Sequence, residues 1–266
     1  MIGSITPFLV PFKDGLDAIS VDEFFPPAIL FEGTPFELNR VMMVRLIAVA
    51  IVSIVLLSAS KRAKIIPGKG QVLVEMVLEF VRKNIVCEII QSKDIATKVT
   101  PLITLIFVGI LSMNITGIIP GLNIAGSSVI GIPLCFAIIS YVAFIYIGIK
   151  VHGVGKFIKS QLMPPGIPKI LCPVFVLIEI LSTFIVRPFT LVIRLLANMI
   201  AGHLLLVLFF IATHMFILSM SAYTLFAPLT FLMSIGVYAF EIFVALLQAY
   251  IFALLSAVYI QLSVEH

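Results

Sequence analysis

Long runs of apolar residues, separated by short polar or proline-rich segments, dominate this chain. Five of them extend over about residues 41–58, 100–119, 129–149, 187–218 and 226–262. A run of about 20 apolar residues is long enough for a helix to cross the hydrocarbon core of a bilayer. The pattern therefore predicts an all-α membrane protein with about five transmembrane helices.

The segment 71–91 is too charged to cross a membrane, but it has its own pattern. Its charged residues fall at helical spacing on one face and its apolar residues on the other: Glu75, Glu79 and Arg82 against Val74, Val77, Leu78 and Val81. This separation is typical of an amphipathic helix that lies at a membrane interface. We expect one such helix between the first and second spans.

The last two runs are unusually long. A shorter segment, 172–185, leads into the first of them, and a serine-containing turn at 219–223 joins the two. A helix of 32 residues is about 48 Å long at ~1.5 Å per residue, against a hydrocarbon core of about 30 Å. We therefore expect a long, strongly tilted helical hairpin.

Composition and charge support a membrane protein and suggest its orientation. The chain is 61% hydrophobic and 11% charged, which excludes an ordinary soluble domain, and its net charge of +4 does not indicate nucleic-acid binding. Twelve of the seventeen basic residues lie in 60–98 and 150–169, so both segments should be cytoplasmic. Five spans then place the N-terminus outside and the C-terminus inside.

Three parts of the chain follow from this organisation. Residues 1–39 form an extracytoplasmic N-terminal segment, residues 40–169 hold the first three spans and the interfacial helix, and residues 170–266 form the hairpin. No metal or cofactor is expected. The three cysteines, Cys87, Cys135 and Cys172, are far apart and lack metal-ligand spacing, and Gly68-Lys69-Gly70 is a turn rather than a phosphate loop.

Arg194 is the most informative residue, because it stands in the middle of an apolar run with no acid within a dozen residues. An arginine deep in a membrane helix costs about 2.5–3.5 kcal/mol on insertion scales. Its guanidinium keeps its charge at any biological pH. The sequence therefore suggests that Arg194 meets an anion from elsewhere.

The other polar residues of the hairpin fall into two levels. If the hairpin folds about Ser221, residues whose numbers sum to about 443 lie at the same depth. Arg194 then lies level with Gln248, and His203 lies level with Glu241, about 13 Å away. At about 100° per residue, Asn198 shares the side of Arg194, whereas His203 points the opposite way.

Spacing alone leaves alternatives open for these residues. His203 and Glu241 could form a titratable relay or a structural ion pair, and we weigh the two equally. Asn198 and Gln248, taken alone, could simply hydrogen-bond neighbouring helices, as His214 could near the outer end. Arg187 precedes a proline near the inner interface, so we interpret it as a side chain that snorkels toward water.

Several motifs carry a resemblance to a known family. The run from Arg194 through Asn198 to His203, and the return helix with Glu241 seven residues before Gln248, resemble the core of subunit a of F-type ATP synthases. The segment from Asn114 to Pro120 is similar to an earlier Asn-x-x-Gly-x-x-Pro motif of that family. The resemblance covers nearly the whole chain and is most specific over residues 187–252.

The resemblance implies a role for each residue. Arg194 would be the essential barrier charge facing the carboxylates of a rotating c-subunit ring, with Asn198 and Gln248 beside it. His203 and Glu241 would line the outer half-channel, with Asn114 as a contributor. Some members of the family have an acid at the position of His203 and a histidine at the position of Glu241. Glu179 would lie on the cytoplasmic exit.

Glu179 departs slightly from the family pattern. It lies fifteen residues before Arg194, where the family leads us to expect fourteen. We therefore expect one extra residue in the region 183–186.

The resemblance also implies partners and a place in the cell. The chain would work in a bacterial plasma membrane with the c ring, the peripheral-stalk b subunits and the rest of an ATP synthase, and would couple proton flow to ATP synthesis. It would perform no catalysis alone, since it carries no nucleotide motif. The alternative is a proton-coupled transporter or channel that acts alone, although no internal repeat supports it.

Overall fold

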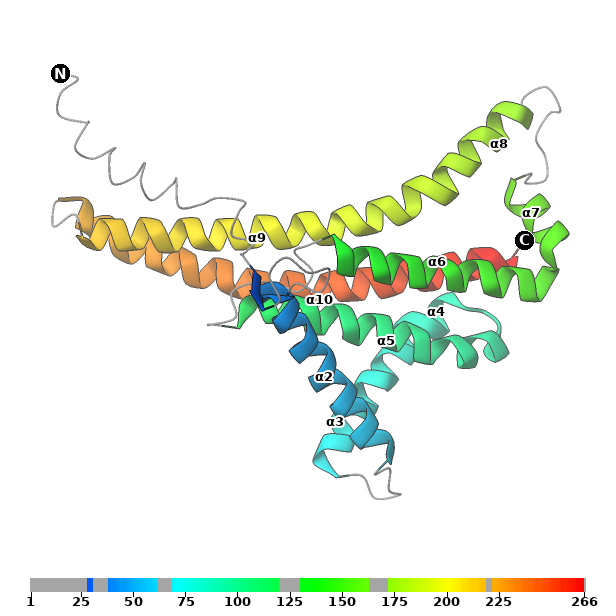
Figure 1. Ribbon diagram of the computed structural model, residues 1–266, viewed down its shortest axis with the longest axis horizontal. Coiled ribbons are helices and arrows are strands. Elements are labelled where there is room, and N and C mark those ends of the chain that lie inside the picture. Colours follow the sequence, from blue (N-terminus) through cyan, green and yellow to red (C-terminus); the bar gives the residue numbers. More distant parts are fainter. Residues whose placement is uncertain are drawn as a thin grey trace.

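The computed structural model is an elongated, almost entirely helical molecule (Figure 1). It describes residues 28–30, 38–61, 68–119, 130–162, 172–218 and 222–265. Most of the expected N-terminal segment, the uncharged loop at 121–128 and the proline-rich part of the basic loop lie outside these residues. So does the centre of the hairpin turn.

Five of the described helices are long and apolar enough to cross a membrane, as the sequence predicts. They are α2 (Arg40–Lys61), α5 (Lys93–Ile118), α6 (Gly131–His152), α9 (Arg187–Leu218) and α10 (Ala227–Glu265). The span that contains α9 begins upstream of it, in α8 (Cys172–Ile180) and the π-helix η3 (Leu181–Val186). The expected lead-in segment is therefore continuous with the first arm of the hairpin.

Shorter elements connect the spans. They are α3 (Lys69–Val81), the π-helix η2 (Arg82–Val86), α4 (Cys87–Ile89), α7 (Val154–Leu162) and the 3₁₀-helix η4 (Ala222–Phe226). A short antiparallel pair of strands, β1 (Ala28–Leu30) and β2 (Leu38–Asn39), precedes α2. The sequence pattern did not predict these strands.

The expected amphipathic helix is α3, and its two faces are as predicted except that Leu78, expected on the apolar face, is 37% exposed. Glu75 and Glu79 are exposed, whereas Val81 is fully buried. The helix also packs inside the protein, because Val74 and Val77 line an apolar groove together with residues of α2 and α5. Figure 1 shows α2 and α3 projecting together from one side of the molecule.

The core lies where α5 and α6 pack on the second half of α10. Its fully buried residues include Ile106, Ile110 and Phe252, and a hydrogen bond of 2.8 Å joins Ser140 of α6 to Ser256 of α10. Helix α9 runs beside α10 along the long axis of the molecule and then bends away toward α8 (Figure 1). The core thus holds α10 firmly, while one side of α9 remains open.

Candidate functional site between the last two helices

The hairpin folds back in the register that the sequence predicts. The hydroxyl of Thr213 donates a hydrogen bond of 2.9 Å to Thr230, and those two numbers sum to 443. A Cβ atom added to Gly202 would lie 3.2 Å from Oε1 of Glu241, and this pair has the same sum. The two arms therefore match in depth from the turn to the middle of the hairpin.

A groove of about 510 Å³ lies between the two arms. Its polar residues are Arg194, Asn198, Glu241 and Gln248, and its walls are otherwise apolar. Four of the predicted site residues thus come together in one place. Because Gly202 lies beside Glu241, Arg194 is about 12 Å farther along α9, at the other end of the groove.

Asn198, rather than Arg194, is the hydrogen-bonding partner of Gln248. The Asn198 Nδ2 atom donates to Oε1 of Gln248 at 3.0 Å. The sequence predicts that Arg194 and Gln248 share a level, and both do line the groove. However, the direct contact is one helical turn closer to the hairpin tip, since two neutral amides satisfy each other without engaging the guanidinium.

Arg194 is exposed, and it forms no ion pair with any acid in the part of the chain that the structure describes. Its neighbour Leu195 is fully buried, so the helix face next to the guanidinium is fixed by packing. The charge therefore stands on an apolar surface without an anion from the described residues. This is the arrangement that the sequence suggests.

Glu241 and His203 have different environments. Glu241 is 6% exposed, and its Oε2 atom is buried without a hydrogen-bond partner among the described residues. His203 is half-buried and is not one of the residues that line the groove. This agrees with the prediction that His203 and Arg194 point to different sides of α9. Whether His203 and Glu241 act as a relay stays a prediction.

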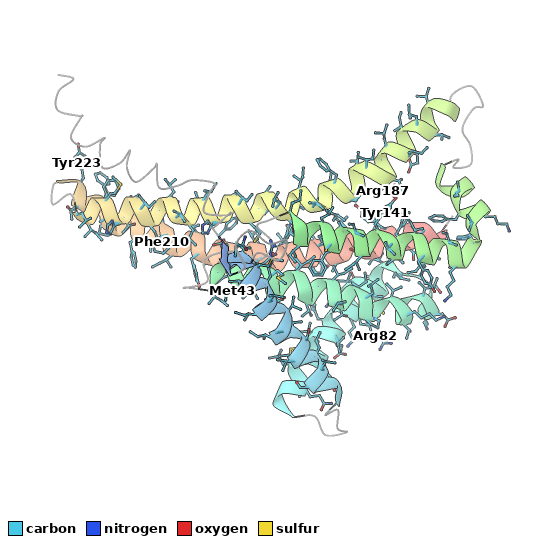
Figure 2. All side chains as sticks on the ribbon, in the orientation of Figure 1. Met43, Arg82, Tyr141, Arg187, Phe210 and Tyr223 are labelled. Atoms are coloured by element: carbon cyan, nitrogen blue, oxygen red, sulfur yellow. The ribbon has the colours of Figure 1, made fainter. Side chains whose placement is uncertain are left out.

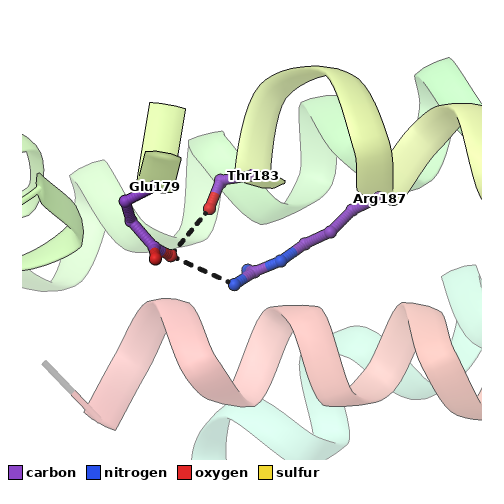
Figure 3. A network of polar contacts seen from close by, with 3 residues as sticks. All are labelled: Glu179, Thr183 and Arg187. Carbon is purple, nitrogen blue, oxygen red and sulfur yellow. Dashed lines mark hydrogen bonds and ion pairs between the residues drawn. The ribbon is translucent and has the colours of Figure 1, made fainter. Parts of the chain in front are cut away.

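Glu179 belongs to a separate polar network on the α8 side (Figure 3). Its Oε1 atom accepts a hydrogen bond of 3.0 Å from the Thr183 hydroxyl and pairs with Nη2 of Arg187 at 3.3 Å. The Arg187 guanidinium also lies over the ring of Tyr259, 5.8 Å from its centroid. Arg187 is thus paired inside the protein, and its interpretation as a snorkelling side chain was wrong.

The π-helix η3 explains this pairing. Eight residues of regular α-helix would place Arg187 about 80° away from Glu179, whereas seven would place it about 20° away. The π-helix takes up one extra residue at Leu181–Val186, so that Glu179 and Arg187 share a face. The region coincides with the extra residue that the sequence predicts. The sequence signal for this extra residue was the spacing of fifteen residues, rather than fourteen, between Glu179 and Arg194.

Asn114 lies outside the groove. It is fully buried in α5, and its Nδ2 atom donates to the backbone oxygen of Ala245 in α10 at 3.3 Å. Nearby, the Tyr238 hydroxyl donates to the backbone oxygen of Ile118 at 3.0 Å. Both contacts fix α5 against the arm that carries Glu241 and Gln248.

The fold and the site together define a class of protein. It is a multi-pass helical membrane protein in which an arginine without an anion among the described residues, an amide pair and a buried carboxylate share one groove.

Comparison with known sequences gives the family. Residues 41–261 match the family model of the ATP synthase A chain, and this chain belongs to that family. It is 44% identical over 253 residues to ATP synthase subunit a of Rhodococcus erythropolis, covering 95% of this chain and 92% of the relative. It is 37% identical to the subunit of Frankia alni, covering 86% and 78%, and 36% identical to that of Streptomyces lividans, covering 84% and 78%.

Proposed function

We propose that this chain is the stator subunit of a rotary ATP synthase, in which its hairpin faces a ring of c subunits. Membership of the ATP synthase A chain family supports this function and gives no support to a transporter that acts alone. The relatives are bacterial, and the five apolar helices make the chain a multi-pass protein of the plasma membrane. It works as part of a complex with other subunits.

One observation carries the proposal, namely the exposed guanidinium of Arg194 without an acid of the described chain beside it. A charge of this kind in lipid needs an anion, which a carboxylate on a passing ring subunit would supply. The arginine favours the charged form of each arriving acid, which makes the acid release its proton. It also remains positive throughout, so protons cannot pass directly between the two half-channels.

We assign the two half-channels to opposite sides of Arg194. Glu241 and His203, on the side of the hairpin turn, line the outer half-channel, and Asn114 supports it by fixing α5 to α10. Glu179, with Thr183 and Arg187, lines the inner exit. Asn198 and Gln248 lie beside the barrier, where their mutual hydrogen bond leaves the guanidinium available to the ring.

The orientation in this proposal follows the distribution of basic residues. The segments 60–98 and 150–169 face the cytoplasm, the N-terminus lies outside and the C-terminus inside. The hairpin turn then faces the outside, which is the side from which protons enter during ATP synthesis. The peripheral-stalk b subunits would hold the chain against rotation.

Replacing Arg194 by alanine is the test of this function. We expect the R194A variant to assemble normally and to lose proton-driven ATP synthesis in membrane vesicles. The matched control is Arg82→Ala, because Arg82 is an exposed arginine on the far side of the molecule from α9 (Figure 2). Normal synthesis by the R194A variant would refute the barrier role.

Exchanging His203 and Glu241 tests the outer half-channel separately. Because the two residues lie at one depth, the double exchange should retain more proton-driven ATP synthesis than either single change to leucine. If the exchanged protein is the least active of the three, the two residues do not share one path.

A further inference from the structure

A second groove, distinct from the one that holds Arg194, lies between α5 and α6. Its volume is about 350 Å³. The chain enters the membrane with α5 and returns with α6, so the start of the first helix meets the end of the second. Lys98 and Lys150 therefore lie at the same end of this groove, and both contribute to its lining.

The remaining walls are almost entirely apolar. Apart from the two lysines and Tyr146, the lining consists of Ile95, Val99, Leu102, Ala143, Ile147 and Val151. Ala143 is the smallest of these side chains and lies about 10 Å from Lys150 along α6. The groove is thus cationic at one end and apolar along the rest of its length. This matches the polarity of an anionic amphiphile, which has a charged headgroup and an apolar tail.

Both lysines are available to an anion. The Lys150 Nζ atom donates to the Tyr146 hydroxyl at 3.5 Å and lies 5.5 Å from the centroid of that ring, which holds it at the mouth and leaves other N–H donors free. Lys98 is exposed and forms no ion pair with the described residues, although Asp94 lies one turn before it. No acid among the lining residues opposes the two charges.

We propose that this groove binds an anionic phospholipid, with its phosphate between Lys98 and Lys150 and one acyl chain along Leu102, Ala143 and Ile147. Basic sites between membrane helices on the cytoplasmic side select anionic headgroups, and each lysine near the surface strengthens binding about fivefold. Two lysines together should give a preference of about 25-fold over a zwitterionic lipid. The ion path does not depend on this site.

The probe is phosphatidylglycerol with a photoactivatable group on its acyl chain. The purified ATP synthase complex is placed in nanodiscs of phosphatidylcholine with a small fraction of the probe, and labelled peptides are identified by mass spectrometry. We expect labelling of α5 and α6 near Leu102 and Ala143. The double variant Lys98→Gln, Lys150→Gln should lose about 25-fold in labelling.

The matched control is Lys93→Gln, Lys156→Gln, which removes the same charge from exposed positions that do not line the groove. The control should label as the unchanged protein does. A third variant, Ala143→Phe, fills the apolar channel while it keeps both lysines, and it should lose labelling as well.

Three results would overturn the proposal. They are unchanged labelling in the variant without Lys98 and Lys150, equal loss in the control, and cross-linking of a cysteine at position 147 to another subunit, since a protein helix would then cover the groove. None of these results would affect ATP synthesis through Arg194, so the lipid site and the stator function can fail separately.

Discussion

Helices α5 and α9 are both apolar enough to cross a membrane, yet the protein uses them differently. In the apolar 18-residue stretch that marks α5 as a span, 50% of the residues are buried, against 11% in the corresponding stretch of the span that includes α9. Helix α5 is enclosed by α2, α3 and α10, whereas α9 packs mainly on α10 and α6 and leaves one side open. An apolar sequence alone cannot distinguish a helix that belongs to the core from one that keeps a face for a partner. Helix α9 also carries the exposed charge of Arg194 within its apolar sequence.

The sharpest test of this comparison uses two phenylalanines of one helix. Phe252 of α10 is 2% exposed in the core, whereas Phe243, nine residues earlier, is 59% exposed. Phe252→Ala should cost about 3–5 kcal/mol in the free energy of unfolding, because it leaves a cavity. Phe243→Ala should cost less than about 1 kcal/mol. Thermal unfolding of the purified complex measures both, and equal losses would show that the open face is in fact part of the core.

The second test concerns the ion pair on the α8 side. Both side chains are about a quarter exposed, so the pair should be stronger than a surface pair of about 0.2–1 kcal/mol and weaker than a fully buried one. Because Glu179 would lose its partner at the proposed inner exit, we expect Arg187→Gln to lower the rate of proton-driven ATP synthesis by about tenfold, or ~1.4 kcal/mol in the activation barrier. The charge exchange Glu179→Arg, Arg187→Glu should recover part of that loss. If the exchanged protein is no better than the single variant, the two residues act independently.

The third test compares two glycines of the hairpin. A Cβ atom at Gly202 would lie 3.2 Å from the Glu241 carboxylate, whereas one at Gly236 would meet nothing within 4 Å. Gly202→Ala should displace the carboxylate by a few tenths of an ångström and lower ATP synthesis several-fold, on the order of 1 kcal/mol. Gly236→Ala should leave synthesis unchanged and stabilise α10 slightly. Equal activities of the two variants would show that the exact position of Glu241 does not matter.

The smallest effect is expected near the turn. Thr213 and Thr230 share a hydrogen bond between the two arms. Double-mutant cycles of such bonds in membrane proteins average about 0.6 kcal/mol. A cycle with Thr213→Val and Thr230→Val should give a coupling of that size in thermal unfolding. A coupling of zero would contradict the register of the hairpin.

The sequence predicts much of this fold because apolar runs and turns determine where membrane helices begin and end. The bounds expected for the first arm, 187–218, agree with α9, and the fold-back about Ser221 predicts the contact between Gly202 and Glu241. Both follow from regular helical geometry. The grouping of Arg194 with Gln248 in one groove follows from the same reasoning.

The remaining details depend on departures from that regularity. A pairing by depth cannot tell whether Gln248 bonds Asn198 or Arg194, because the choice depends on side-chain conformations within one turn. We interpreted Arg187 as solvent-directed because it precedes a proline near the inner interface, and that position does not reveal the π-helix that brings Arg187 to Glu179. The packing of α3 on α2 and α5 could not be predicted either, because the alternation of polar and apolar residues does not identify which helices will be neighbours.

The wide turn at Leu181–Val186 has a consequence for how this family can vary in length. A surplus residue there is absorbed locally, so the helices on either side keep the same rotational phase. Removing one residue from the turn should restore an ordinary α-helix and leave Glu179 aligned with Arg187. One residue added between Arg187 and Arg194 has no such buffer and would rotate the pair of Glu179 and Arg187 by about 100° relative to Arg194. A change of one residue is therefore tolerated before Arg187, in the π-helix, whereas the number of residues between Arg187 and Arg194 must stay constant.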